Sequence, residues 1–385
     1  MLKPRLKFGI IFNFQAKWMG GIIYILNVIR ILDFLNEDEK PEITLFYRAD
    51  LKKFVDGIRY PYFQAVEWKF PSIYTGFIKS WLTGKNHFVE PLLKNYDVDT
   101  LYPLHDFPVR ARTNKKLVCW YADLQHKYYP EFFTKRKLLE RDLRIRYILK
   151  NSRDLVVSSQ AVKDDFLKFY TIPKHLNIHI YHFVSIIDDL PEVSYESLCE
   201  KYDLPFEYFM ISNQFHKHKN HKTALLALAE LKKQNKPVYF VLTGRFPEKP
   251  DSPYMQELHD IINLNDLKKH ISFLGLIPRG DQLLLMKHAK AIVQPSLFEG
   301  WSTVIEDAKS LQVPVIASDL PVNIEQLGAK GQFFSPHDYH RLATLLNETP
   351  ARIEGQLIYE PYETSMREAA TNFLSLFRNS EFYPD

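Results

Sequence analysis

The chain of 385 residues has few cysteines, few glycines and almost no excess of charge of either sign. Two cysteines, Cys119 and Cys199, are too few for a disulfide framework or a four-cysteine zinc site, and they favour a reducing compartment. The 13 glycines exclude a collagen-like repeat. Lys and Arg number 50, and Asp and Glu number 46, so the formal net charge is only +4. Together with 46% hydrophobic residues, this balance excludes a mostly disordered chain.

Long hydrophobic runs are also missing. The first apolar run, residues 8–12, is too short for the core of a signal peptide. The longest, residues 20–35, is interrupted by Asn27, Arg30 and Asp33. No run reaches the roughly 18 residues that a membrane span needs. We therefore expect a cytoplasmic protein that is either soluble or bound peripherally at the inner face of a membrane.

Strand and helix patterns alternate along the first half of the chain. A buried strand is predicted at 7–12, followed by a helix that opens at Gly20 and Gly21 and repeats apolar residues at spacings of three and four. The other elements predicted here are strands at 43–47, 100–104, 117–121, 154–158 and 178–183, and helices at 133–151 and 161–170.

The pattern restarts near residue 205, after a polar, proline-containing stretch at 187–205 that we interpret as the boundary. The second half is predicted to hold strands at 208–212, 238–243, 271–274, 291–294 and 314–318, and helices at 221–234, 253–263, 280–287, 302–311, 323–327 and 338–346. Alternating elements favour parallel sheets wrapped by helices. The predicted fold is α/β, with two doubly wound domains, 1–190 and 200–360, facing across a cleft that holds the site. The last helix, within 363–385, is expected to return to the first domain.

The segment 295–308 carries the strongest chemical signal. A strand ends at Gln294, a loop holds Glu299, and Ser302 is a good N-cap for the helix that follows. The free N–H groups at the start of that helix make an anion site without any lysine. Glu299 and Asp307 beside such a site would be costly unless they bind hydroxyls, as on a sugar or a ribose. The alternative is that Ser302 only caps the helix and the acids are solvated.

Residues 298–319 resemble the donor-site motif of the retaining glycosyltransferases of family four, the glycosyl transferases group 1. This family has the GT-B fold of two Rossmann-like domains. The resemblance extends over nearly the whole chain, through Gly20-Gly21 and residues 123–126, 158–159, 213–221 and 242–245.

The resemblance implies roles for individual residues. Glu299 would contact hydroxyls of the donor sugar, and Asp307, where the family usually has Glu, would hold the ribose. Glu306 is rotated by about 100° on the helix and cannot face the same way. The implied catalytic residues are Glu299, Lys219, His126 and Asp123. The implied donor-binding residues are Gly20, Gly21, Asn213, Lys217, Gly244, Arg245, Gly300, Trp301, Ser302, Thr303 and Asp307.

The segment 213–221 is basic and contains three histidines. Lys219 matches the family's lysine that neutralises the leaving diphosphate, whereas the family's arginine is replaced by Gln214. Lys217 or Arg245 is left to supply that charge. Two other interpretations are a metal site of the three histidines, which lacks an acid or cysteine to complete it, and a solvated basic loop.

Residues 120–130 follow a strand of the first half and are expected on the rim of the cleft. Ala122 stands where many family members have a histidine, which leaves Asp123 and His126 to touch the sugar or the acceptor; a lone histidine is more often structural. Gly20 and Gly21 allow a phosphate or an acceptor to approach the backbone, unless they only make a turn. With no third glycine they are not a dinucleotide fingerprint.

The helix from 135 to 153 is basic and amphipathic. It is a candidate for contact with anionic lipid, or a solvated face packed on the sheet. Nucleic acid is not an expected partner, because the net charge is small and no recognition motif is present.

The resemblance implies a hexosyltransferase that moves a sugar from a UDP- or GDP-linked donor to a glycan or lipid-linked acceptor in surface-polysaccharide biosynthesis. The resemblance implies retention of configuration and no metal or cofactor. Two alternatives stay open: another GT-B enzyme, such as a sugar-nucleotide epimerase, and a nucleotide-sugar-binding protein with impaired catalysis. Gln214, Ala122 and Asp307 motivate the last.

Overall fold

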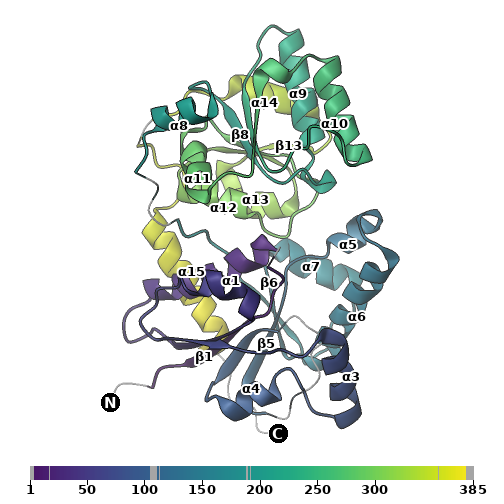
Figure 1. The fold of residues 1–385 in the computed structure, drawn as a ribbon, viewed down its shortest axis with the longest axis vertical. Helices are drawn as coiled ribbons and strands as arrows, with labels where there is room; N and C mark the ends of the chain where they lie inside the picture. The colour runs from purple at the N-terminus through teal and green to yellow at the C-terminus, as the bar shows by residue number, and fades with distance from the viewer. Residues whose placement is uncertain are drawn as a thin grey trace. The chain divides into compact units, whose positions relative to one another are not determined.

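The computed structural model describes residues 4–16, 18–104, 111, 113–187, 190, 192–353 and 355–378. The chain divides into two compact units (Figure 1). Unit 1 runs to Val184 and includes the chain from Glu363 onward, and unit 2 is Ser185–Tyr362. Within the described residues, no helix is both long enough and apolar enough to span a bilayer.

Unit 1 is built on a parallel sheet in the order β3-β2-β1-β4-β5-β6-β7. Its strands are β1 (Lys7–Phe12), β2 (Glu42–Tyr47), β3 (Phe63–Glu67), β4 (Thr100–Leu104), β5 (Lys116–Tyr121), β6 (Asp154–Val157) and β7 (Asn177–Ile180). Its helices are α1 (Met19–Ile31), α2 (Lys52–Val55), α3 (Ile73–Thr83), α4 (Glu90–Asn95), α5 (Gln125–Tyr128), α6 (Lys135–Asn151) and α7 (Gln160–Phe169). The order reverses between β1 and β4, as in doubly wound sheets.

The last helix, α15 (Tyr362–Arg378), packs in unit 1 although it follows unit 2 in sequence. Phe373 and Phe377 meet the ring of Phe8 on β1 at centroid distances of 5.8 and 4.7 Å. Lys116 of β5 donates a hydrogen bond to the carbonyl of Leu376. Residues 379–385 of the predicted returning helix lie outside the described residues.

Unit 2 repeats the doubly wound pattern, with the parallel order β10-β9-β8-β11-β12-β13. Its strands are β8 (Phe209–Ser212), β9 (Phe240–Thr243), β10 (Ile271–Gly275), β11 (Ile292–Gln294), β12 (Val315–Ser318) and β13 (Gln332–Phe334). Its helices are α8 (Tyr195–Tyr202), α9 (His221–Lys233), α10 (Pro253–Leu264), α11 (Arg279–His288), α12 (Thr303–Ser310), α13 (Pro321–Leu327) and α14 (Tyr339–Glu348).

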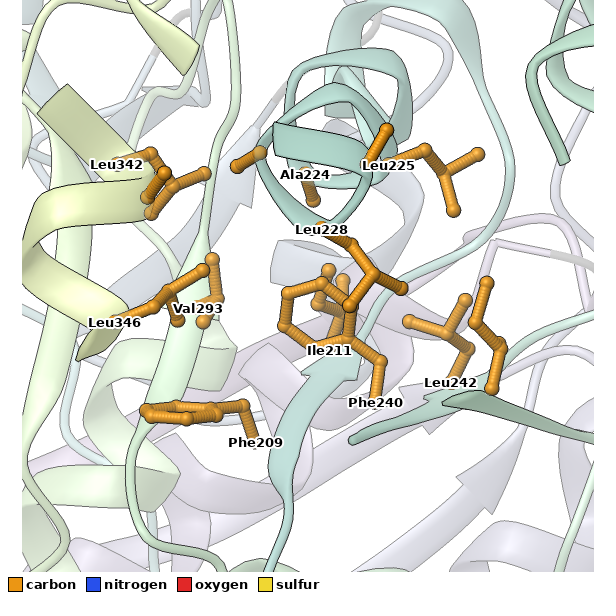
Figure 2. Close-up of a cluster of buried hydrophobic side chains, with 14 of the residues drawn as sticks. Phe209, Ile211, Ala224, Leu225, Leu228, Phe240, Leu242, Val293, Leu342 and Leu346 are labelled. Atoms are coloured by element: carbon orange, nitrogen blue, oxygen red, sulfur yellow. The ribbon is translucent and has the colours of Figure 1, made fainter. Parts of the chain in front are cut away.

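One face of the unit 2 sheet is covered by α9 and α14 (Figure 2). Leu228 of α9 and Leu346 of α14 pack over Ile211 of β8 and Val293 of β11, and all four side chains are buried. The central strands are apolar on both faces because helices cover both, which is typical of parallel sheets. This core fixes the ends of β8 and β11 side by side.

The predicted boundary stretch, 187–205, contains a helix that the sequence analysis missed. Ser194 caps α8 by accepting a hydrogen bond from the N–H of Ser197. Two residues of this helix, Leu198 and Cys199, are buried. A short helix with only two buried residues has too weak an apolar period to stand out from a polar linker. The elements β3, α3, α4 and β13 were also not predicted.

Candidate functional site

The candidate site lies where the strand order of unit 2 reverses, between β8 and β11. Ligands of doubly wound sheets bind beyond the carboxyl ends of the strands at such a point. The segments that leave these two strands, 213–220 and 295–302, are the two that the sequence analysis singled out in this half. They are joined directly, because the N–H of Leu297 donates to the carbonyl of His218 at 2.7 Å.

An ion pair joins the two segments. Lys219, at the end of a short 3-10 turn, lies with its Nζ 2.6 Å from Oε1 of Glu299. The same oxygen accepts hydrogen bonds from Gln294 Nε2 at 2.7 Å and from Ser296 Oγ at 2.6 Å. The Lys219 and Glu299 side chains are 19% and 9% exposed. Three donors on one shielded carboxylate oxygen fix its position.

Burial and charge act in opposite directions on Glu299. Burial alone would raise the pKa of this carboxyl. The Lys219 ammonium, together with the hydrogen bonds from Lys219 and Ser296, more than offsets this, so the pKa lies below its ordinary value. Glu299 is therefore an anion at neutral pH, able to accept hydrogen bonds from hydroxyl groups.

Two asparagines hold the loops around this pair. Asn213 follows β8 and donates to Gln294 Oε1 at 2.9 Å, in a buried position. Asn220 has a left-handed backbone (φ 55°), which asparagine tolerates better than most residues. Its side-chain amide donates to the carbonyls of Pro295 and Pro336 at 2.9 and 2.7 Å. The position of Lys219 is thus set by its neighbour in sequence.

Gly244 directly follows β9 and lies against the backbone of Asn213. Its φ is +111°, and a Cβ there would lie 2.4 Å from the carbonyl oxygen of Asn213. Only glycine fits this approach. Next to it, the backbone N–H of Arg245 donates to Oε1 of Gln214 at 3.3 Å. Gln214, at the position of the family's arginine, therefore holds backbone, while the side chain of Arg245 is exposed.

The first turn of α12 follows Glu299 after a loop that contains the half-buried Gly300 and Trp301. Ser302 caps the helix by accepting from the N–H of Ile305 at 3.3 Å, and Thr303 is its first residue. The amide of Gln326 brackets Ser302 by donating to its carbonyl at 2.8 Å and accepting from its N–H at 3.2 Å. These two hydrogen bonds fix the first turn of α12, which carries the positive end of the helix dipole. This turn follows directly after the loop that contains Glu299.

The two acids of α12 have different partners, as their rotation on the helix requires. Glu306 accepts from Gln326 at 2.8 Å and from Lys309 at 3.1 Å. Asp307 is buried and accepts from Arg279 Nη2 at 2.5 Å and from the hydroxyl of Ser185. Asp307 is therefore paired with an arginine that the sequence analysis did not consider.

The candidates of unit 1 form two separate groups. Gly20 and Gly21 lie in the first turn of α1, and a Cβ on Gly21 would lie 2.6 Å from the ring of Trp18. That ring stacks on Trp120 at a centroid distance of 5.8 Å. Gly21 thus makes room for an aromatic side chain, and Gly20 is exposed.

Asp123 and His126 both contact Arg141 of α6. Arg141 donates to Asp123 Oδ1 at 3.0 Å and to His126 Nδ1 at 3.2 Å. His126 is buried, and burial together with the charge of Arg141 lowers its pKa to about 4. The imidazole is neutral at pH 7 with its proton on Nε2, since Nδ1 accepts from Arg141. The predicted contact of both residues with sugar or acceptor stays a prediction.

The three histidines of the basic loop do not converge. His216 and His218 stack on each other at 5.7 Å, whereas His221 is buried against Phe215 at a centroid distance of 4.1 Å. Among the described residues, no three His, Cys, Asp or Glu side chains are grouped as a metal site would need.

The structure thus gathers Asn213, Lys219, Gly244 and Glu299 around the end of one sheet, next to the capped start of α12. Five supporting residues are not predicted from the sequence: Ser185, Asn220, Arg279, Gln294 and Gln326. Only Gln294 left a signal in the sequence, as a polar residue that ends an apolar strand.

Comparison with known proteins gives these residues a family. Residues 201–350, which contain this site, match the family described as Glycosyl transferases group 1. This stretch of unit 2 is similar to that family. This confirms the resemblance drawn from the residues.

Two curated relatives are bacterial O-antigen chain mannosyltransferases. The O-antigen chain mannosyltransferase RfbU of Salmonella typhimurium is 25% identical over 245 residues, which cover 58% of this chain and 62% of the relative. The O-antigen chain mannosyltransferase B of Escherichia coli is 22% identical over 227 residues, 58% of each chain. The chain thus spans about three-fifths of the length of these relatives.

Solved structures share the fold over almost the full chain. A glycosyltransferase from Rickettsia africae matches with a TM-score of 0.63 and 17% identity, covering 97% of both chains. HepE of Anabaena, solved in complex with UDP-glucose, matches with a TM-score of 0.62, 17% identity and the same coverage. The predicted fold class, α/β of the GT-B type with two Rossmann-like doubly wound domains, is confirmed.

Proposed function

We propose that the chain is a retaining glycosyltransferase that moves a hexose from a UDP- or GDP-linked donor to a glycan or lipid-linked acceptor of a surface polysaccharide. The family match and the names of the O-antigen relatives support the reaction class and the pathway. The UDP-glucose complex of HepE supports a nucleotide sugar as the donor. We propose that the reaction needs no metal ion and no cofactor.

The Lys219–Glu299 pair beside the start of α12 carries this proposal. An ammonium group and a helix N-terminus together suit a diphosphate. A carboxylate held by Gln294 and Ser296 suits sugar hydroxyls. When a donor binds, Lys219 would turn to the diphosphate, and Glu299 would keep its two neutral donors and accept from the sugar.

We propose the following chemistry for that arrangement. The bond between the sugar and the diphosphate breaks, and the acceptor hydroxyl forms its bond on the same face of the sugar. The hydroxyl proton passes to an oxygen of the leaving diphosphate. Lys219 and the N–H groups of α12 stabilise the charge that grows on the diphosphate. Ser302 and Thr303 hold the same group, and Asp307 is left to bind the ribose. In unit 1, we propose that Asp123 and His126 serve the sugar or the acceptor.

The experiment that tests this function starts with calorimetric titration of UDP, GDP, ADP and dTDP, with and without EDTA. Saturable binding of one nucleotide in EDTA identifies the donor class and supports a metal-free site. The matching sugar donors are then incubated with acceptors, and the anomer of the product is determined by NMR. An inverted anomer would contradict the retaining reaction, and binding of none of the four would remove the donor site.

A second candidate, a nucleotide-sugar-binding protein with impaired catalysis, is favoured by two observations. Gln214 replaces a cationic residue and holds backbone instead. Asp307 is paired with Arg279 rather than presented alone. This candidate predicts nucleotide binding without transfer or donor hydrolysis. Affinity for a 2′-deoxynucleotide tests the ribose contact directly, because loss of the 2′-hydroxyl weakens binding only if Asp307 receives it.

A further inference from the structure

Helix α3 of unit 1 carries large apolar residues on its solvent-exposed face, whereas a helix that only packs on a core buries them. Its inner face presents small residues: Gly76 and Ser80 are buried, and a Cβ on Gly76 would lie 2.4 Å from the ring of Phe88. Its outer face presents Trp81, Leu82 and Ile78, which are 71, 70 and 55% exposed. Close packing of α3 on Phe88 therefore holds its large apolar side chains away from the core.

Helix α6 lies beside α3 and extends this surface (Figure 1). Arg136 of α6 donates to the hydroxyl of Tyr74 of α3 at 2.7 Å, and Phe77 meets Tyr147 at a centroid distance of 4.7 Å. An exposed stripe at spacings of three and four runs along α6 and mixes basic and apolar side chains. Its members are Arg136, Leu139, Leu143, Arg146 and Lys150.

Along α3 and the segments that flank it in sequence the charge has one sign, and the acidic side chain that contacts α3 from α6 is Glu140, which accepts from the hydroxyl of Tyr74. Between Glu67 and Glu90 the sequence holds Lys69, Lys79 and Lys85 and no acidic residue. Exposed apolar patches rimmed by such residues mark interaction sites rather than ordinary surface. Lysines beside exposed Trp and Leu are the composition of a segment that lies in the interface of an anionic bilayer.

We propose that the outer faces of α3 and α6 form a docking surface for an anionic phospholipid bilayer, with Ile78, Trp81 and Leu82 entering the headgroup region. The basic side chains of both helices would contact lipid phosphates. Because the close packing of Gly76 against Phe88 already fixes α3 in unit 1, binding to a bilayer would cost this helix little conformational entropy. Lipid contact is one of the two interpretations that the basic α6 segment allows from its sequence, and α3 adds the apolar part of the surface. This proposal does not depend on the donor site of unit 2.

Co-sedimentation of the full chain with vesicles tests the proposal. Vesicles of phosphatidylcholine alone are compared with vesicles that also contain phosphatidylglycerol. We expect binding to the anionic vesicles, weakened by salt. The pair Ile78→Ser and Trp81→Ser should lower the partition coefficient by about tenfold or more. Lys79→Gln and Lys85→Gln should lower it by about fivefold each.

Matched controls come from unit 2. Leu264→Ser on α10 removes an apolar side chain that is even more exposed than those of α3, and Lys236→Gln removes an exposed lysine. Neither should change vesicle binding, and every variant should keep its nucleotide binding and its melting temperature. The proposal is overturned if anionic vesicles do not bind, or if the α3 variants bind as the controls do. It is also overturned if sedimentation velocity shows a dimer that the α3 variants dissolve, because the surface would then join two copies of the chain.

Discussion

At the residue scale, the site depends on a shielded ion pair whose two members do not contribute equally. Glu299 would keep hydrogen bonds from Gln294 and Ser296 if Lys219 were removed. Lys219 has no such second set at its ammonium, where Glu299 is the partner that the structure shows. The lysine is therefore the member that is able to change partners when a diphosphate arrives, and the glutamate is the fixed one.

Replacing Lys219 with Ala should lower turnover by about 100-fold or more, because one preorganised charge at the leaving diphosphate is lost. It should also raise the pKa of Glu299, since burial would no longer be offset by the ammonium. Steady-state kinetics with the matching donor measures the first effect.

The control for this variant is Lys222→Ala, three residues along the chain. The Lys222 side chain on α9 forms an ion pair of 2.5 Å with Glu257 on α10 and not with a residue of the site. Turnover of the control should stay near that of the unmodified enzyme. Circular dichroism of both variants shows whether the fold is kept. Full turnover of a folded Lys219→Ala variant would contradict the role given to this residue.

At the scale of elements, α12 and α8 begin in the same way but in different surroundings. Ser302 and Ser194 each accept a hydrogen bond from the N–H three residues later. Ser194 is exposed, whereas Ser302 is buried and clamped by Gln326 beside the candidate anion site. The two caps therefore separate stability from binding.

Ser302→Ala and Ser194→Ala should each lower the free energy of unfolding by about 1 kcal/mol, the usual cost of losing a serine cap. Ser302→Ala alone should also weaken nucleoside diphosphate binding, because the first turn of α12 loses its fixed position. Urea titration measures the stability, and calorimetry measures the binding. Equal diphosphate affinity in the two variants would show that α12 does not bind the ligand.

These elements also show how far the sequence leads. The strands and helices around Glu299 were predicted to within two residues at most ends, since their apolar periods are strong and Ser302 marks a helix start. The missed helix α8 buries only two residues, so its period is faint. The pairing of Asp307 with Arg279 joins residues 28 positions apart on different helices, and no local pattern encodes such a contact. The role of Asn220 could not be predicted, because it depends on a left-handed backbone conformation and on contacts with distant carbonyls.

At the scale of the whole molecule, each unit contains a histidine that folding shields from protons. His126 in unit 1 has a pKa lowered to about 4, through burial and the charge of Arg141. His221 in unit 2 has a pKa lowered to about 3, through burial and the charge of Lys219. Both imidazoles have an ordinary pKa of about 6.5 in the unfolded chain. At a pH between the lowered pKa of each histidine and about 6.5, the imidazole is therefore protonated in the unfolded chain but not in the folded chain.

The free energy of unfolding should therefore fall as the pH decreases below about 6.5, by about 1.4 kcal/mol per pH unit for each buried histidine. Glu299 adds to this loss at lower pH, because its lowered pKa makes the unfolded chain the first to be protonated. Urea unfolding at pH 7.5 and at pH 5 should give free energies of unfolding that differ by about 2 kcal/mol for unit 1 and by about the same amount for unit 2. His126→Gln should remove most of the difference in unit 1, and His221→Gln most of it in unit 2, where burial and the charge of Lys219 also lower the pKa of His216. The exposed His175 and His340, each replaced by Gln, are the matched controls. A pH dependence that survives both buried-site variants would place the proton uptake elsewhere in the chain.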